Sequence, residues 1–101
     1  LRHALVAMHE QPAEEWSLQA LAERAGMSRS AFAEGFREVI GSTPGQYLQA
    51  WRTRLVQQAL RRGQPLKRIA GDVGYGSEAA LSRAFKAQTG QSPREWRSAA
   101  M

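Results

Sequence analysis

The side chains best suited to chemistry in this sequence are cations, and they are unevenly distributed. The 101 residues carry 14 Lys and Arg against 9 Asp and Glu, a formal net charge of +5. Residues 1–50 hold four basic and six acidic side chains, a net charge of −2. Residues 51–101 hold ten basic and three acidic side chains, a net charge of +7. This asymmetry indicates a polyanionic partner whose binding depends mainly on the second half.

Several of these cations are expected to neutralise phosphate groups, which Lys and Arg contact without reading sequence. The candidates are Arg29, Arg37, Arg52, Arg54, Lys86 and Arg94. A single arginine is more often a solvated surface charge, so the prediction concerns the set. Arg61 and Arg62 are interpreted as solubilising the end of a long helix.

The sequence gives little support to catalytic, metal or cofactor chemistry. Cysteine is absent, which excludes disulfides, thiolate metal sites and a cysteine nucleophile. His3 and His9 are six residues apart and do not share a helix face, so we interpret them as exposed side chains. No Ser–His–acid set, paired-carboxylate cleft or glycine-rich phosphate loop can be assembled. We therefore expect no enzyme, no cofactor and no metal.

The composition also bears on where the protein works. No apolar run approaches the roughly 20 residues that span a bilayer. The first residues lack the apolar segment of a signal peptide. A reducing compartment fits the absence of cysteine, so we expect a cytoplasmic protein. Because the chain does not begin with Met, we expect it to be part of a longer protein.

The apolar periodicity that must position these cations is helical throughout. Apolar residues recur at i, i+3, i+4 and i+7, as in Leu1–Met8 and Leu66–Val73. No stretch alternates as a half-buried strand would. We predict an all-α protein with seven helices at about 1–10, 17–24, 28–40, 44–62, 65–72, 77–89 and 93–99. The side chains expected to be buried by helices 28–40 and 77–89 are Phe32, Phe36, Val39, Ile40, Leu81, Ala84 and Phe85.

Residues typical of helix ends support these boundaries. Ser17 and Ser28 are predicted N-caps, and Gly26 is expected to end the helix between them. Thr43-Pro44-Gly45-Gln46 has a cap, a proline at the first helical position and a glutamine at the third. Ser92-Pro93-Arg94-Glu95 repeats that pattern with a glutamate. Trp16, Trp51 and Trp96 are expected in the core, and Asp72 is expected to pair with Arg68.

An internal repeat is the most informative feature. A shift of 49 positions places Ser28 on Ser77, Phe36 on Phe85 and Pro44 on Pro93. Upstream the shift is 48, placing Gly26 on Gly74, because Gly76 is an extra residue in the second turn. Matching serine, glycine, proline and phenylalanine residues make chance similarity a poor explanation, so we infer a duplicated helical unit.

Each repeat has the pattern of a helix-turn-helix motif. A short helix, at 18–24 or 66–72, is followed by a glycine turn and a serine-capped second helix. In DNA-binding versions this second helix enters the major groove. The long helix 44–62 measures roughly 28 Å, and successive major grooves on one face lie about 34 Å apart. One chain is therefore expected to reach two grooves.

Two stretches carry a family resemblance. Residues 17–32 read SLQALAERAGMSRSAF, and residues 69–97 read IAGDVGYGSEAALSRAFKAQTGQSPREWR. Over nearly its whole length the chain resembles the DNA-binding domain of AraC-type bacterial transcription regulators, and the second stretch is the more specific. The resemblance implies seven helices, two helix-turn-helix motifs and double-stranded DNA as partner. It also implies an effector-binding or dimerisation domain outside this chain.

By resemblance, certain exposed positions on the second helix of each motif are candidate base readers. They are Ser30, Ala33, Glu34, Glu78, Ala79, Ser82 and Arg83. Ser28 and Ser77 can donate to phosphate, since the N-termini of their helices also present free N–H groups.

Each charged residue among the candidate base readers could also have another role. Arg83 suits the O6 and N7 atoms of guanine, but a phosphate contact is an almost equal alternative. Glu34 and Glu78 either accept from cytosine N4 or pair within the chain with Arg37 or another arginine, and for Glu34 we favour the pair within the chain. Because Glu34 and Arg83 occupy equivalent positions, the two motifs should prefer different bases. We therefore expect an asymmetric target.

We predict one DNA-binding domain over residues 1–101. It comprises a first helix-turn-helix subdomain at 1–43, a linker helix at 44–62 and a second subdomain at 63–101. The alternative is a helical protein-interaction module, which could contact RNA polymerase. The salt dependence of binding to random duplex DNA separates these two hypotheses.

Overall fold

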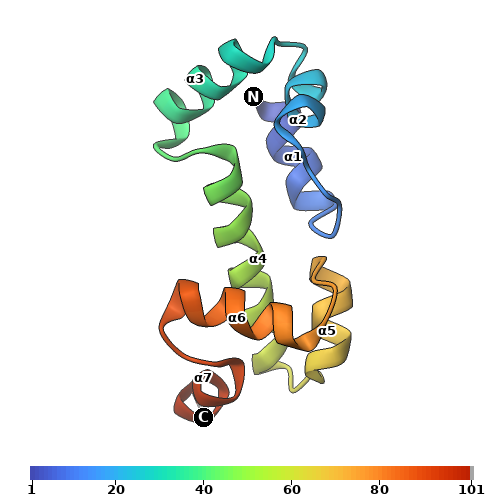
Figure 1. Ribbon diagram of the computed structural model, residues 1–101, viewed down its shortest axis with the longest axis vertical. Coiled ribbons are helices and arrows are strands. Elements are labelled where there is room, and N and C mark those ends of the chain that lie inside the picture. The colour runs from blue at the N-terminus through green and yellow to red at the C-terminus, as the bar shows by residue number, and fades with distance from the viewer. Residues whose placement is uncertain (101) are drawn as a thin grey trace. The chain divides into compact units, whose positions relative to one another are not determined.

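The structure, a computed structural model, describes residues 1–100 and has seven α-helices and no strand in that range (Figure 1). The helices are α1 (Arg2–Glu10), α2 (Leu18–Ala25), α3 (Arg29–Ile40), α4 (Pro44–Arg61), α5 (Leu66–Val73), α6 (Glu78–Thr89) and α7 (Pro93–Ala100). The all-α prediction is confirmed, with every predicted boundary within one residue of the observed one. Several helices predicted one residue too early begin after an N-cap serine, whose backbone is extended rather than helical.

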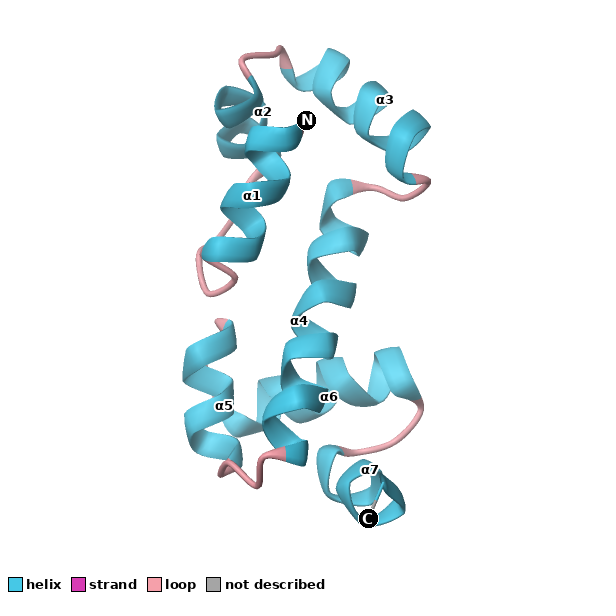
Figure 2. Ribbon diagram, turned by 180° about the vertical axis from the view of Figure 1, so that it is seen from behind, coloured by secondary structure: helices cyan, strands magenta, loops and turns pink. Residues whose placement is uncertain are grey.

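The chain divides into two compact units. The first runs from Leu1 to Trp51, and the second begins at Arg52. The division falls inside α4, so this helix contributes to both units. Figure 2 shows α1, α2 and α3 of the first unit and α5, α6 and α7 of the second. Each unit has an apolar core of its own.

The first core lies where α1, α2, α3 and the first turns of α4 meet. Its buried side chains are Ala4, Met8, Leu21, Ala22, Phe32, Phe36 and Leu48. The Phe36 ring is central, since its centroid lies 5.7 Å from the centroids of both Phe32 and Tyr47. Trp16 is half-buried against this core, as predicted.

The second core lies between the last turns of α4 and helices α5, α6 and α7. Its buried side chains are Val56, Ala59, Leu60, Ile69, Ala70, Val73, Leu81 and Phe85. Trp96 of α7 packs edge-on against Phe85, with ring centroids 6.0 Å apart. The predicted core position of Trp96 is therefore confirmed, although its side chain stays partly exposed.

The predicted caps are present as side-chain hydrogen bonds. The hydroxyl oxygens of Ser17, Ser28 and Ser77 accept from the backbone N–H three residues later, at 3.0–3.2 Å. At α4, Gln46 N–H donates to the Thr43 hydroxyl and Thr43 N–H donates to the Gln46 side chain. The same reciprocal pair joins Ser92 and Glu95 at α7. These caps satisfy N–H groups that the helices cannot satisfy internally.

The duplication extends one helix further upstream than the sequence comparison detects. In α1 the buried residues are Ala4, Ala7 and Met8. Buried residues of α4 follow the same spacing 52 positions later, at Val56, Ala59 and Leu60. The sequence comparison missed this because the loop after α1 is longer than the loop after α4 and changes the shift. Each unit therefore consists of a supporting helix, a helix-turn-helix motif and a closing helix.

One of the expected core positions is wrong, and two, Ile40 and Ala84, are only half-buried. Val39 was expected to be buried, yet its side chain is 70% exposed. It lies in the last turn of α3, beyond Phe36, where Ile40 packs against the core instead. Ala84 on α6 is only half-buried. Helical periodicity gives the direction of a side chain but not how far its packing partners extend along the helix.

Candidate nucleic-acid interface

The first helix-turn-helix motif turns at a left-handed glycine. Gly26 has φ of +68°, and its N–H donates to Glu23 O at 3.1 Å. The next residue, Met27, donates its N–H to Ala22 O at 3.0 Å. This pair of bonds closes the end of α2 and directs the chain to Ser28, the cap of α3.

The second motif repeats this turn. Gly74 has φ of +95°, and Tyr75 N–H donates to Ala70 O at 2.8 Å. Met27 and Tyr75 are therefore structural equivalents, and the extra Gly76 follows that point. The predicted turn chemistry is confirmed in both motifs. A side chain at either left-handed glycine would strain the turn.

The candidate base readers lie on the outer faces of α3 and α6. Ser30, Glu34, Glu78, Ala79 and Arg83 are exposed, while Ala33 and Ser82 are half-buried. The buried face of each helix carries the aromatic core residue described above. The structure thus places each set along one helix of its own unit, in reach of an external partner.

Most candidate phosphate residues are also exposed. They are Ser28, Arg29, Arg37, Arg54, Ser77, Lys86 and Arg94. Ser28 and Ser77 use their oxygens as acceptors within their caps, which leaves each hydroxyl hydrogen available for an anion. Arg52 differs from the set because it is half-buried.

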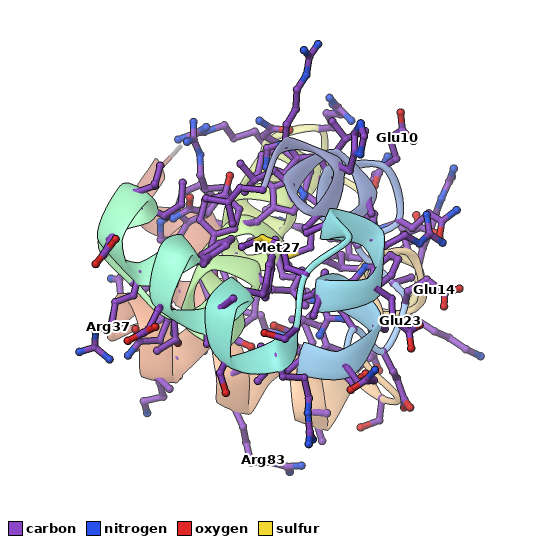
Figure 3. The ribbon with its side chains drawn as sticks, turned by 90° about the horizontal axis from the view of Figure 1, so that it is seen from above. Glu10, Glu14, Glu23, Met27, Arg37 and Arg83 are labelled. Atoms are coloured by element: carbon purple, nitrogen blue, oxygen red, sulfur yellow. The ribbon has the colours of Figure 1, made fainter. Side chains whose placement is uncertain are left out.

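Equivalent positions of α3 and α6 carry opposite charges. Arg83 extends away from α6 into solvent (Figure 3). Glu34, its counterpart on α3, is also exposed. The expected pair with Arg37 is absent, since Glu34 makes no salt bridge with any residue in 1–100. Glu34 thus keeps its acceptor oxygens available.

Glu78 lies in a setting that its sequence position did not indicate. It lines a hollow of about 220 Å³ together with Leu60, Leu66, Pro93, Arg94 and Arg97. Two cations of α7 therefore share this hollow with the first acidic residue of α6. Glu78 thus lies near two arginines, but within the described chain it makes no salt bridge with either of them.

Two arginines take structural contacts that sequence reasoning missed. Arg61 was interpreted as a solubilising charge, yet its guanidinium carbon lies 5.2 Å from the Trp96 ring centroid. Arg97 Nη2 donates to Gln64 O at 2.6 Å. Both contacts join residues about 35 positions apart, so no local pattern could have revealed them. They hold α7 against the helix ends beside it.

A third arginine contact involves one of the candidate phosphate residues. The Arg52 guanidinium carbon lies 5.8 Å from the centroid of the Tyr75 ring, in the turn before α6.

The predicted pair of Arg68 and Asp72 is also present, with Nε and Oδ2 3.7 Å apart. Because both of its side chains are exposed, that pair contributes at most about 1 kcal/mol.

One carboxyl group of the second unit has a shifted pKa. The backbone N–H of Ser92 hydrogen-bonds the Glu95 carboxylate, which lowers the pKa of Glu95 below its usual value. The Ser92 hydroxyl and the charge of Lys86 lower this pKa further. Gln46, the equivalent residue of the first unit, forms the same cap without a titratable group.

The histidines do not form a metal site. His9 Nε2 lies 2.7 Å from the Tyr47 hydroxyl, and its ring centroid lies 4.4 Å from that of Trp51. Trp51 is thus half-buried against His9. Among residues 1–100, no three His, Cys, Asp or Glu side chains are placed to hold a metal ion. In the same range, no helix combines the length and apolar character needed to cross a membrane.

Comparisons with known proteins agree with this geometry. A family model described as a helix-turn-helix domain matches residues 21–99. The transcriptional regulator AlkR of Acinetobacter baylyi is 45% identical over 98 residues, which cover 96% of this chain and 32% of AlkR. A transcription regulator of Streptomyces antibioticus that is named AraC-like is 45% identical over 95 residues, covering 93% of this chain and 31% of that protein. The chain thus spans about a third of the length of these curated relatives.

A solved structure extends the likeness to three dimensions. The DNA-binding domain of AdpA, determined in complex with a target DNA, superposes with a TM-score of 0.88 and 33% sequence identity. The match covers 97% of this chain and 89% of that one. The duplicated glycine turns, the serine caps and these matches have one explanation. The chain belongs to the helix-turn-helix domain family, in its AraC-type form.

Proposed function

We propose that this chain binds double-stranded DNA sequence-specifically, as the DNA-reading part of a bacterial transcription regulator. The observation that carries the proposal is the duplicated motif, in which α3 and α6 each follow a left-handed glycine turn and expose a polar face. The likeness to the AdpA domain, which was solved with DNA, supports it. The net charge of +7 in residues 51–101 supports a polyanionic partner.

Helix α4 is the proposed spacer between two reading helices. Its 18 residues measure about 27 Å at roughly 1.5 Å per residue. Successive major grooves on one face of DNA lie about 34 Å apart. We propose that α3 and α6 enter successive grooves, with the subdomains 1–43 and 63–101 on either side of the linker 44–62. A monomer would then occupy both grooves.

The proposed contacts fall into two groups. Ser30, Ala33, Glu34, Glu78, Ala79, Ser82 and Arg83 face the bases, with Arg83 donating to guanine O6 and N7 and Glu34 accepting from cytosine N4. The phosphate group comprises Ser28, Arg29, Arg37, Arg52, Arg54, Ser77, Lys86 and Arg94. Since Glu34 and Arg83 are equivalent in the repeat, the proposed target is asymmetric.

The first test is a salt titration of binding to random-sequence duplex DNA, measured by fluorescence anisotropy. If Z phosphates are neutralised, log K should fall with log salt with a slope of about −0.9Z. A flat dependence without a complex would contradict the proposal. That result would favour a protein-interaction module, with RNA polymerase as a partner to examine next.

The second test uses duplexes selected from a random library, followed by footprinting. We expect an asymmetric site with protection of two adjacent major grooves. Arg83→Ala should relax specificity at one base pair by about 1–3 kcal/mol if Arg83 reads guanine. An even loss across all sequences would assign Arg83 to phosphate instead. Protection of a single groove would contradict the role proposed for α4.

The proposed function also bears on where the full-length regulator works and on what the rest of it does. Bacterial chromosomal DNA lies in the cytoplasm, so we propose that the protein works there. The curated relatives are about three times as long as this chain. We propose that an effector or dimerisation domain in the full-length protein controls this DNA-binding part.

A further inference from the structure

A row of three side chains in the second unit leads from the supporting helix to the buried face of α6. The Arg61 guanidinium carbon lies 5.2 Å from the Trp96 ring centroid. The Trp96 ring meets Phe85 of α6 edge-on, with centroids 6.0 Å apart. Arg61 is exposed, Trp96 is half-buried and Phe85 is buried. The row therefore connects the surface to the core beneath a proposed reading helix.

The first unit contains the same row built from different side chains. A shift of 52 positions places His9 on Arg61, and a shift of 49 places Tyr47 on Trp96. His9 Nε2 and the Tyr47 hydroxyl form a hydrogen bond of 2.7 Å. The Tyr47 ring meets Phe36 of α3 edge-on, with centroids 5.7 Å apart. The outer contact thus differs in chemistry between the units, while the order of the contacts and the ring geometry are the same.

Each row is suited to fixing the orientation of its reading helix. His9 and Arg61 lie in the last turns of α1 and α4, where the negative end of the helix dipole favours a cation or an N–H donor. An edge-on ring pair has a preferred angle, because the positive edge of one ring meets the negative face of the other. A side chain that holds the outer ring therefore restricts the tilt of the phenylalanine beneath it.

We propose that Arg61 is a positioning residue for α6 in DNA reading, and that His9 is its counterpart for α3. The inference rests on the proposed function and deepens it, since it names residues that orient the reading helices without contacting DNA. Hydrogen bonds to base edges depend on angle, whereas attraction between charges depends mainly on distance. Loss of a positioning contact should therefore reduce discrimination between base pairs and leave the salt slope unchanged.

The test compares the affinities of the 101-residue chain and its variants for three probes, by anisotropy. The probes are the library-selected duplex, the same duplex altered at single base pairs, and random-sequence duplex. The base pair at which Arg83→Ala relaxes specificity marks the half-site of α6, and the one changed by Glu34→Arg marks that of α3. Arg61→Gln should lower discrimination about two- to five-fold at the α6 half-site, which is the range of an exposed cation–aromatic contact. His9→Gln should have a similar effect at the α3 half-site.

Matched variants separate the ring contact from charge and composition. Arg62→Gln removes the same charge at the next, exposed position and should leave discrimination unchanged. His3→Gln, at an exposed position of α1, is the equivalent control for His9→Gln. Arg61→Lys keeps a cation over the ring and should retain part of the discrimination. In a Trp96→Leu background, Arg61→Gln should have no further effect on discrimination.

The ratio between probes distinguishes positioning from a general loss of stability. A variant that only unfolds more easily loses affinity for all three probes by the same factor, and thermal unfolding measures that loss directly. If Trp96→Leu fails to fold, the comparison of Arg61→Lys with Arg61→Gln still tests the contact. Unchanged ratios in Arg61→Gln or His9→Gln would overturn the inference, and so would equal losses at both half-sites.

The salt slope gives a second criterion. A slope that falls by about 0.9 in Arg61→Gln would make Arg61 a phosphate contact and would also overturn the inference. If the unmodified chain prefers the selected duplex and binds with a steep slope in those cases, the proposed function stands. Absence of salt-dependent binding by the unmodified chain would overturn both.

Discussion

The two units of this protein share a backbone plan but carry different surfaces. Both have a glycine turn, a serine-capped second helix and a reciprocal cap on the closing helix. Residues 1–50 nevertheless have a net charge of −2 and residues 51–101 a net charge of +7. Core and caps are thus kept where folding requires them, while the exposed side chains differ. The comparison separates what the fold needs from what a partner would read.

The largest expected effect tests whether the two cores are independent. Phe36→Ala and its counterpart Phe85→Ala each remove a buried ring and should cost about 3–5 kcal/mol of stability in their own unit. Hydrogen exchange should show lost protection over 18–40 for the first variant and over 66–89 for the second. If either variant exposes both units equally, the molecule unfolds as one cooperative body and the comparison fails.

A second prediction exchanges the charges at equivalent reading positions. Glu34→Arg gives α3 the cation that α6 has at Arg83, and it removes a carboxylate that phosphates repel. Binding should strengthen, and one base pair of the selected site should change its preference toward guanine by about 1–3 kcal/mol. Library selection with both chains measures this effect. Arg83→Glu is the reciprocal control and should weaken binding. A selected site unchanged by Glu34→Arg would show that α3 does not read bases at this position.

A smaller effect concerns a glycine inside α3. Gly35 is helical and corresponds to Ala84 of α6, and a Cβ on Gly35 would meet Met27 at an ordinary 3.9 Å. Gly35→Ala should therefore stabilise the first unit by about 0.5–1 kcal/mol. Chemical denaturation followed by circular dichroism measures the change. Gly26→Ala is the matched contrast, since φ of +68° should make the same substitution destabilising. Equal signs for both variants would contradict the assigned turn.

The smallest effect is a difference in acid response between the closing helices. The folded-state pKa of Glu95 is lowered, so its carboxylate stabilises α7 above the unfolded pKa. That contribution is lost as pH falls through the folded-state pKa of Glu95. Amide exchange in the first turn of α7 should therefore speed up in acid relative to the first turn of α4, after correction for intrinsic rates. Glu95→Gln should remove the difference, and Gln46→Glu should create it in α4. An acid response that survives Glu95→Gln would assign it to another group.

Local chemistry explains why the elements could be predicted from sequence. Ser17, Ser28 and Ser77 cap helices through bonds to residues three positions away, and Gly26 turns the chain at a single φ angle. Each of these interactions joins residues that lie within about one helical turn of each other. The apolar period then indicates which face is buried. It misplaced Val39, whose burial depends on how far neighbouring helices extend along α3.

The candidate site was predictable only in part for the same reason. The exposed faces of α3 and α6 follow from periodicity, so most proposed readers lie where they were expected. The setting of Glu78 beside Arg94 and Arg97 does not follow from periodicity, because it requires α7 to pack near the start of α6. The expected pair of Glu34 and Arg37 also failed to form, although their spacing allows it.

The amino-acid order alone therefore determined the seven helices, their ends and the duplicated motif, since each depends on residues a few positions apart. Only the tertiary structure decided which arginines contact an aromatic ring far away in the sequence and which extend into solvent. Arg52 on Tyr75 and Arg61 on Trp96 join residues more than 20 positions apart, whereas Arg83 extends into solvent. These arginines can contact the Tyr75 and Trp96 rings only after the helices have packed against each other. The tertiary fold thus distinguishes cations that look alike in the sequence.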